Sequence, residues 1–215
     1  MILYGASMSP FVRKVLVFAD EKGIALELTM AHARSTDPGF LEASPFRKIP
    51  ALRDDDFVLA DSSAIVAYLD ALHPEPNLIP TEPRARAKTV WFEEFADSIL
   101  TGTGVKIVFN RLVAPMLGMT GDAAAADRAE AEELPPILDY LEGVIPESGF
   151  LVEDRFTLAD IAVASPLASL PLADWRGDAA RHPKLTAWTE AIHARPAFAR
   201  WMEQDRVFLQ ARGAA

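Results

Sequence analysis

Apolar residues in the first eighty positions recur with two different periods. A short apolar run at residues 2–4 and the alternation of apolar and polar residues over 25–30 each predict a strand. Residues 10–22 carry apolar side chains at helical spacing, and Gly23 then favours an end to that helix. A strand–helix–strand unit of this size indicates a parallel strand pair joined by a right-handed crossover.

Two further strands and a helix follow in the same region. Residues 49–52 and 57–59 are apolar and flank the acidic turn 54–56, which predicts a β-hairpin. Asp61 and two serines then open a helix with an apolar face, and the proline-rich segment 73–77 ends it and is typical of a linker. The first part of the chain therefore mixes strands and helices.

Beyond Pro83 the apolar period is helical almost throughout. Residues 101–104 include two glycines and form a weak point in the first helix, and Pro135 should kink the second helix or start a new segment. We expect an α/β domain over residues 1–78, followed by an all-helical domain over residues 84–215. The expected helices cover residues 84–117, 123–145, 157–173, 183–194 and 196–209.

The composition is that of a globular protein. The 215 residues, 50% of them hydrophobic and 24% charged, are enough for one large or two small cores. A net charge of −10 argues against nucleic acid or an anionic membrane as the main partner. The chain has no cysteine, which excludes disulfides, zinc–thiolate sites and a cysteine nucleophile. The four histidines lack metal-ligand spacing, so no metal site is expected.

The sequence also lacks the patterns of a membrane span and of a signal peptide. No run of about 18 apolar residues occurs, and no basic stretch precedes a long apolar one near residue 1. We therefore expect a cytoplasmic protein.

The stretch Ser7–Val15 places hydroxyl groups where the first strand gives way to a helix. Ser9 lies directly before Pro10, which is tolerated as a first helical residue because that N–H has no partner within the helix. Helix N-termini favour anions, so a bound thiol could be held there as a thiolate. The alternative is that Ser9 only caps the helix.

A second stretch, Ile49–Pro50, stands at the start of a predicted strand. If this peptide bond is cis, the Ile49 backbone can pair with a peptide ligand lying alongside, and capture of a peptide by a strand is a known mode of recognition. The alternative is an ordinary trans bond, which is far commoner.

A third stretch, Asp61–Ser62, opens a predicted helix. The helix N-terminus and the Ser62 hydroxyl can bind a carboxylate, while the Asp61 carboxylate can accept from an ammonium. Carboxylate and ammonium together describe an amino-acid head group. The alternative is that both residues are simple helix caps.

These three stretches, in this order and spacing, resemble the glutathione transferase superfamily. A fourth stretch, Thr157–Asp160, resembles the buried capping box of that family. The resemblance covers nearly the whole chain and implies a thioredoxin-like N-terminal domain followed by an all-helical domain. It also implies a glutathione-dependent, detoxifying transferase that attacks a small electrophile, with glutathione as co-substrate and no cofactor, and it implies a homodimer.

The resemblance assigns Ser9 to the position of the serine in serine-type transferases, and the Ser-Pro-Phe context most resembles plant tau enzymes and bacterial homologues. Ser9 would then donate a hydrogen bond to the glutathione sulfur and stabilise the thiolate, which is the nucleophilic form. Ser7 lies on the same loop and is the competing donor. A deglutathionylating or thiol–disulfide role is disfavoured by the absence of cysteine.

The resemblance also implies how the tripeptide is held. Ile49, before the family's cis-proline at Pro50, would pair with the cysteinyl part of glutathione, and Lys48 stands where a contact to the tripeptide is frequent. Asp61 and Ser62 would hold the γ-glutamyl head. Asp61 stands where relatives often have Glu.

Two further features concern the loop and the second substrate. Ser44–Pro45 replaces the family's Asn-Pro, which leaves the bonding of that loop open. An apolar electrophile pocket is expected from Met8, Phe11, Val105 and Phe109, although plain packing explains the same residues.

Inside the same fold, the alternative functions are a glutathione-dependent isomerase, peroxidase or dehalogenase, or a non-catalytic binding or regulatory protein.

Overall fold

The computed structural model describes residues 1–213 and divides into two compact units. The first unit joins Met1–Ile79 to the segment that begins at Arg195, and the second unit is Pro80–Ala194. The expected boundary near residue 80 is close to this division. The expectation that residues 84–215 form one helical domain differs from it, because the last described helix packs with the first unit.

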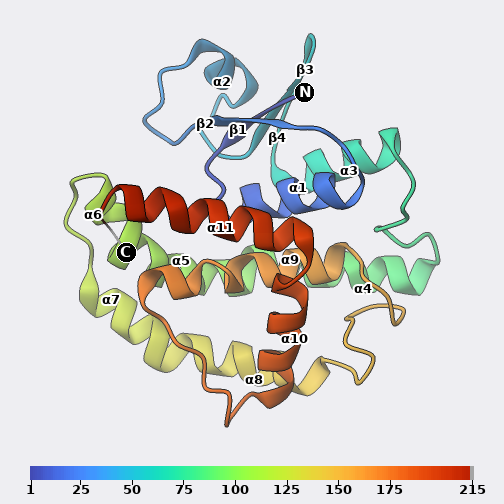
Figure 1. The fold of residues 1–215 in the computed structure, drawn as a ribbon, viewed down its shortest axis with the longest axis vertical. Coiled ribbons are helices and arrows are strands. Elements are labelled where there is room, and N and C mark those ends of the chain that lie inside the picture. Colours follow the sequence, from blue (N-terminus) through green and yellow to red (C-terminus); the bar gives the residue numbers. More distant parts are fainter. Residues whose placement is uncertain (214–215) are drawn as a thin grey trace. The chain divides into compact units, whose positions relative to one another are not determined.

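A four-stranded mixed sheet forms the centre of the first unit (Figure 1). Its spatial order is β2-β1-β3-β4, with β1 and β2 parallel and β3 antiparallel to both of its neighbours. This topology confirms the predicted strand–helix–strand unit and the predicted hairpin. The strands are β1 Ile2–Gly5, β2 Glu27–Met30, β3 Ala51–Asp54 and β4 Phe57–Ala60.

Four helices belong to the same unit. They are α1 Pro10–Glu21, α2 Pro38–Ala43, α3 Ser62–Leu72 and α11 Pro196–Ala211. Helix α1 begins at a proline, as predicted, and the chain leaves it through Gly23, whose φ of +69° is a conformation that glycine adopts without strain. Helix α1 packs against α3 and against α11.

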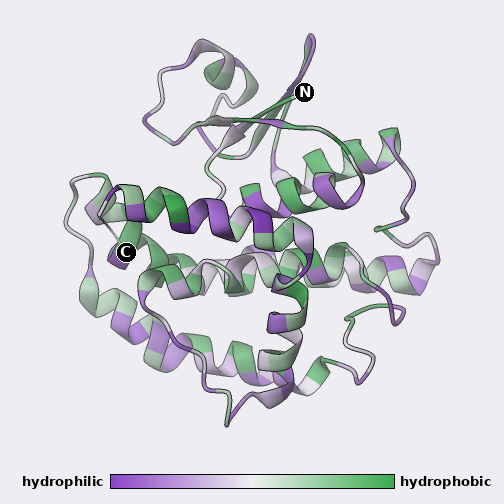
Figure 2. Ribbon diagram, viewed as in Figure 1, coloured by the Kyte–Doolittle hydropathy of each residue, from purple (hydrophilic) through white to green (hydrophobic). Residues whose placement is uncertain are grey.

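Polar contacts hold α11 to the end of α1. Arg195 donates two hydrogen bonds to Glu21, at 2.9 and 2.7 Å. Arg200 and the Trp201 indole both donate to Asp20, the indole at 2.8 Å. Figure 2 shows hydrophilic and hydrophobic bands alternating along α11, as expected for a helix with one buried face.

The second unit is helical. Its elements are α4 Pro83–Glu94, α5 Thr101–Val108, α6 Ala114–Met116, α7 Ala123–Arg128, α8 Leu134–Val144, α9 Leu158–Leu167 and α10 Pro183–His193, with π-helical segments η1 Phe95–Leu100, η2 Phe109–Val113 and η3 Ala129–Glu133 and the 3₁₀ segment η4 Leu170–Ala173. Pro135 falls in the first turn of α8, which confirms that a new segment starts there.

The weak point expected at residues 101–104 is wrong. These residues lie within α5, and the irregular, π-helical turn precedes them at Phe95–Leu100. Neither glycine ends the helix: a Cβ added at Gly104 would make an ordinary van der Waals contact with Leu170 Cδ2 at 3.6 Å, and a Cβ added at Gly102 would have no heavy atom within 4 Å. A glycine inside a helix is tolerated at a modest cost in helix propensity.

Every residue of α9 is buried, and the capping box predicted for its N-terminus is present. The Asp160 carboxylate accepts hydrogen bonds from the Thr157 and Leu151 amides, both at 2.9 Å. Burial raises the pKa of the Asp160 carboxyl to about 6, against the opposing effect of these amide donors. The box therefore fixes both the start of α9 and the chain that precedes it.

Candidate functional site

The sheet brings the three sequence stretches to one end of three neighbouring strands. Ala51 of β3 pairs with Tyr4 of β1 on one side and with Ala60 of β4 on the other. The chain leaves β1 toward Ser9, enters β3 from Ile49, and leaves β4 into Asp61. Adjacent strands lie about 4.8 Å apart, so these stretches start from backbone positions within about 10 Å of one another.

Ser9 occupies the N-cap position of α1 but does not cap it with its side chain. Its N–H donates to the carbonyl of Ala6 at 2.9 Å, and its carbonyl accepts from the Arg13 N–H at 2.8 Å. Pro10 supplies no N–H, so the first helical N–H groups are those of Phe11 and Val12. The simple-cap alternative for Ser9 is therefore wrong, and its hydroxyl lies beside a helix N-terminus without serving that helix.

Ser7 is buried, and its hydroxyl donates to Oδ1 of Asp205 on α11. Asp205 Oδ2 in turn accepts from the Arg13 guanidinium at 2.6 Å, and both of these side chains are almost completely buried. Burial lowers the pKa of Arg13, and the Asp205 carboxylate opposes that shift. Because a serine hydroxyl carries one hydrogen, the Ser7 hydrogen is engaged in this network.

The sequence interpretation missed Arg13 and Asp205. A signal was present: Phe198, Trp201, Asp205 and Leu209 share one face of α11, and all four are buried. A charged residue on an otherwise apolar helical face indicates a buried partner.

Gly5 lets α1 begin close to the end of β1. A Cβ at this position would lie 2.5 Å from Cγ2 of Val12, a fully buried residue of α1. Only glycine leaves room for so short a connection between the strand and the helix that follows Ser9.

In the loop before β3, the Ser44 side chain bonds both backbone groups of Lys48. The Ile49–Pro50 bond is cis, as the resemblance implied. Ser44 Oγ donates to the Lys48 carbonyl at 2.7 Å and accepts from the Lys48 N–H at 2.9 Å, which answers how this loop is bonded without the family's asparagine. The Ile49 side chain packs against the cluster around Tyr4, while Lys48 is exposed.

Asp61 caps α3 through one carboxylate oxygen. Its Oδ1 accepts from the N–H groups of Ser63 at 2.9 Å and Ala64 at 3.2 Å, and its φ is +83°. Ser62 is the first residue of the helix and is buried. The cap role of Asp61 is confirmed, and the Ser62 N–H and hydroxyl lie outside that cap at a helix N-terminus, where anions are favoured.

A buried lysine links the two helix starts. Lys14 Nζ lies 3.3 Å from Ser63 Oγ, and Lys14 is 1% exposed. Its positive charge therefore lies next to the first turn of α3, which adds to the attraction of that helix end for an anion.

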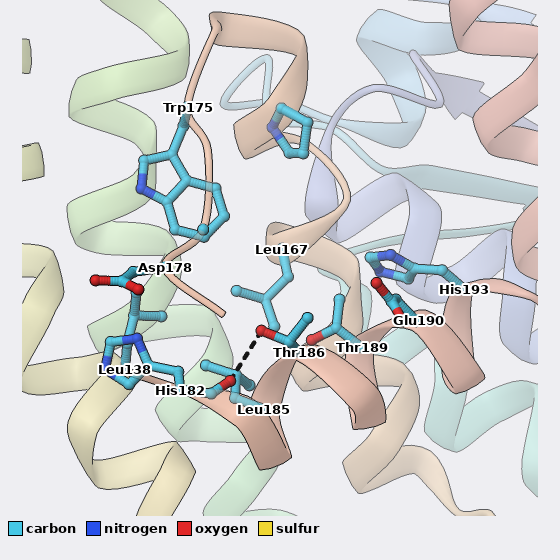
Figure 3. A pocket seen from close by; sticks show the side chains of 12 residues that line it. Leu138, Leu167, Trp175, Asp178, His182, Leu185, Thr186, Thr189, Glu190 and His193 are labelled. Atoms are coloured by element: carbon cyan, nitrogen blue, oxygen red, sulfur yellow. Dashed lines mark hydrogen bonds between the residues drawn. The ribbon is translucent and has the colours of Figure 1, made fainter. Parts of the chain in front are cut away.

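The expected electrophile pocket draws on both units. Met8 and Phe11 belong to the first unit, and Val105 and Phe109 belong to the second, where they are 49% and 37% exposed. Within the second unit, a cavity of about 250 Å³ is lined instead by α10 and the segment before it, including Trp175, Leu185 and His193 (Figure 3). None of the four expected residues lines this cavity.

The histidines at this cavity have structural partners. His182 Nε2 lies 2.8 Å from Asp139 Oδ1, and His193 Nε2 lies 2.9 Å from the Ala164 carbonyl oxygen. In residues 1–213, no three His, Asp or Glu side chains are grouped so that they could hold a metal ion. Over the same residues, no helix has both the length and the apolar character needed to cross a membrane.

Comparison with known proteins identifies the family. Residues 3–77 match the family model described as "Glutathione S-transferase, N-terminal domain", and residues 111–205 match "Glutathione S-transferase, C-terminal domain". The chain is 37% identical to glutathione S-transferase 3 of Zea mays over 205 residues. This alignment covers 91% of this chain and 90% of the maize protein.

Solved structures agree with this comparison. Glutathione transferase F7 from Populus trichocarpa is similar with a TM-score of 0.81 at 30% identity, over 94% of this chain and 97% of the poplar chain. A glutathione S-transferase of Methylobacterium radiotolerans in complex with glutathione sulfonate is similar with a TM-score of 0.77 at 28% identity, over 94% and 93% of the two chains. The chain belongs to the glutathione S-transferase family.

Proposed function

We propose that this glutathione transferase binds glutathione at the shared end of β1, β3 and β4 and that Ser9 holds the sulfur as a thiolate. The observation that carries the proposal is the register Tyr4–Ala51–Ala60, which gathers the three stretches at one end of the sheet. The proposal makes this a serine-type enzyme. The likeness of its Ser-Pro-Phe segment to tau enzymes remains a prediction.

Thiol chemistry defines what Ser9 contributes. A thiol with a pKa near 8.5 is mostly protonated at neutral pH, while the thiolate is the nucleophile. A hydroxyl donor and the N-terminus of α1 both favour the anion. The sulfur then forms a bond to an electrophilic carbon, the leaving group departs with its electron pair, and the thiol proton has passed to solvent. Ser9 is the donor in this scheme, because the Ser7 hydrogen is engaged with Asp205.

The other stretches supply binding groups. The Ser62 N–H and hydroxyl would hold the γ-glutamyl carboxylate, and Asp61 would accept from the neighbouring ammonium through its second oxygen. The Ile49 backbone, next to Pro50, would pair with the cysteinyl part, and Lys48 would contact the tripeptide. The complex of the Methylobacterium relative with glutathione sulfonate supports a glutathione site in a fold of this kind.

Partners and location follow the family expectation. The proposed second substrate is a small electrophile bound beside Met8, Phe11, Val105 and Phe109. We also propose a homodimer in the cytoplasm, with glutathione as the co-substrate.

The test compares serine variants for glutathione binding and for turnover of a generic aryl halide. Ser9→Ala should still bind immobilised glutathione but lose about 10²-fold in kcat, which is the scale for removing one donor to a developing anion. Ser148→Ala, at an exposed loop position, is the matched control and should behave like the parent. A full loss of turnover in Ser7→Ala with normal turnover in Ser9→Ala would contradict the assignment.

A further inference from the structure

Asp205 is a carboxylate placed on the apolar face of α11. It is 1% exposed and lies on the same face as Trp201 and Leu209. Removing a charge from water is costly unless it is paired and hydrogen-bonded. Asp205 meets that requirement with two partners from the start of the chain, Ser7 and Arg13.

These two partners lie on either side of Ser9. Ser7 precedes it by two residues, and Arg13 follows it by one helical turn and donates its backbone N–H to the Ser9 carbonyl at 2.8 Å. One carboxylate therefore holds the segment Ser7–Arg13 at both ends. Asp205 bonds to Ser7 and Arg13 and not to Ser9, so any influence of Asp205 on the sulfur must pass through this segment.

A second set of polar contacts to α1, made by Arg195 and Arg200, lies at the other end of that helix. Asp20 and Glu21, which bind Arg200 and Arg195, stand at the C-terminal end of α1, opposite to Ser9. They hold the same two helices together without touching the Ser9 segment. The chain therefore offers a matched comparison, with one contact at the proposed catalytic end of α1 and another at its far end.

We infer that Asp205 is a positioning residue for the transferase reaction, holding the segment Ser7–Arg13 so that the Ser9 hydroxyl, and not that of Ser7, faces the glutathione sulfur. This inference rests on the proposed role of Ser9. It goes beyond helix packing because it makes the acidity of bound glutathione depend on a side chain from the last described helix of the first unit.

The experiment measures the pKa of bound glutathione, by titrating the ultraviolet absorbance of its thiolate, together with kcat, KM and Tm. Asp205→Asn should raise the thiol pKa by about 1 and lower kcat about tenfold, with KM for glutathione nearly unchanged. Asp205→Glu keeps the charge and should restore part of kcat. Asp20→Asn should lower Tm while leaving the thiol pKa and kcat at their parent values.

Double variants test whether the effect passes through Ser9. In the Ser9→Ala background, adding Asp205→Asn should change neither kcat nor the thiol pKa further, because groups that act as a unit are not additive. If Asp205→Asn fails to fold, Ser7→Ala is used in its place, because it removes the Ser7–Asp205 hydrogen bond and leaves the Asp205–Arg13 pair. Ser7→Ala alone should lower kcat several-fold. Added to Ser9→Ala, it should have no further effect.

Two results would overturn the inference: an unchanged thiol pKa in a folded Asp205→Asn or Ser7→Ala variant, or a full additional loss in the double variant. The proposed function fails by a different result, which is a Ser9→Ala variant with the parent's thiol pKa and kcat.

Discussion

The Ser44 hydroxyl closes a loop on Lys48, donating to its carbonyl oxygen and accepting from its N–H. Ser44 is 1% exposed, so both Lys48 backbone groups depend on a partner that water does not readily replace. This one side chain sets the path of the chain into Ile49 and Pro50.

Ser44→Ala should therefore weaken glutathione binding more than catalysis. We expect KM for glutathione to rise several-fold with kcat changed little, and the free energy of unfolding to fall by about 1–3 kcal/mol because buried polar groups lose their partner. Steady-state kinetics and thermal unfolding check this. Ser35→Ala removes a similar serine–backbone bond from the His32 turn and should leave KM unchanged, while an unchanged KM in Ser44→Ala would contradict the prediction.

Substitutions at Asp61 can separate its role as a helix cap from its proposed role in binding glutathione. Asn is a good N-cap and tolerates positive φ, so Asp61→Asn should retain the parent Tm while raising KM for glutathione through loss of the charge. Asp61→Ala should raise KM as well and also lose about 1 kcal/mol of stability with the cap. If KM stays at the parent value in Asp61→Asn, the carboxylate does not hold the ammonium of glutathione.

Alanine substitution should destabilise the protein at Gly5 and stabilise it at Gly102. Gly5→Ala places a methyl group 2.5 Å from Val12 Cγ2, and overpacking of this kind costs about 1–3 kcal/mol. Gly102 lies in α5 with no heavy atom within 4 Å of an added Cβ, so Gly102→Ala should stabilise by about 0.5–1 kcal/mol. Denaturant unfolding of both variants measures the two signs, and a Gly5→Ala protein as stable as the parent would contradict the steric argument.

The Asp160 carboxyl should make stability depend on pH. Its pKa rises from 3.8 to about 6 on folding because it is buried. Between about pH 4 and 6 the folded state binds a proton that the unfolded state has released, so stability falls as pH rises through this window. The stabilisation by the bound proton is complete below about pH 4 and absent above about pH 6. The difference between the two pKa values corresponds to about 3 kcal/mol in the free energy of unfolding.

Asp160→Asn isolates this effect from the other carboxyl groups. The free energy of unfolding of the parent should exceed that of the variant by a larger margin at pH 4.5 than at pH 7. Only the parent is stabilised by protonation of the Asp160 carboxyl. Urea unfolding at the two pH values gives the difference. If the difference in unfolding free energy between parent and variant is larger at pH 7 than at pH 4.5, the capping box favours the charged carboxylate, which contradicts the prediction.

Much of the fold followed from local pattern. Apolar periods of two and of 3.6 residues located the strands and helices, and Pro10, Gly23 and Pro135 marked helix ends where the structure has them. The Thr157–Asp160 box was found because a capping box is local in sequence. The prediction of a weak point at residues 101–104 was wrong because a glycine gives the same local signal whether it ends a helix or lies inside one.

The candidate site was predictable only in part. Sequence placed Ser9, Ile49 and Asp61 in three separate turns, and the sheet register then located those turns at one end of the strands. The pairing of Asp205 with Arg13 and Ser7 was missed, because the apolar face of α11 shows that Asp205 is buried but does not show which residues, more than 190 positions away, are its partners. The resemblance assigned the donor role to Ser9, and Ser7 was the competing donor because it lies on the same loop. The Asp205 contact, which engages the Ser7 hydrogen, supports the proposed role of Ser9.

The assignment of α11 to the first unit also bears on how the protein assembles. The unit that holds Ser9 is interrupted by the whole of Pro80–Ala194, so its core includes contacts between residues very distant in sequence. Such contacts form slowly, since the intervening chain must be ordered or looped out first. During synthesis, the unit that includes residues 1–79 would then be completed only after α11 has been made, and the nascent enzyme would acquire its activity only once α11 had left the ribosome.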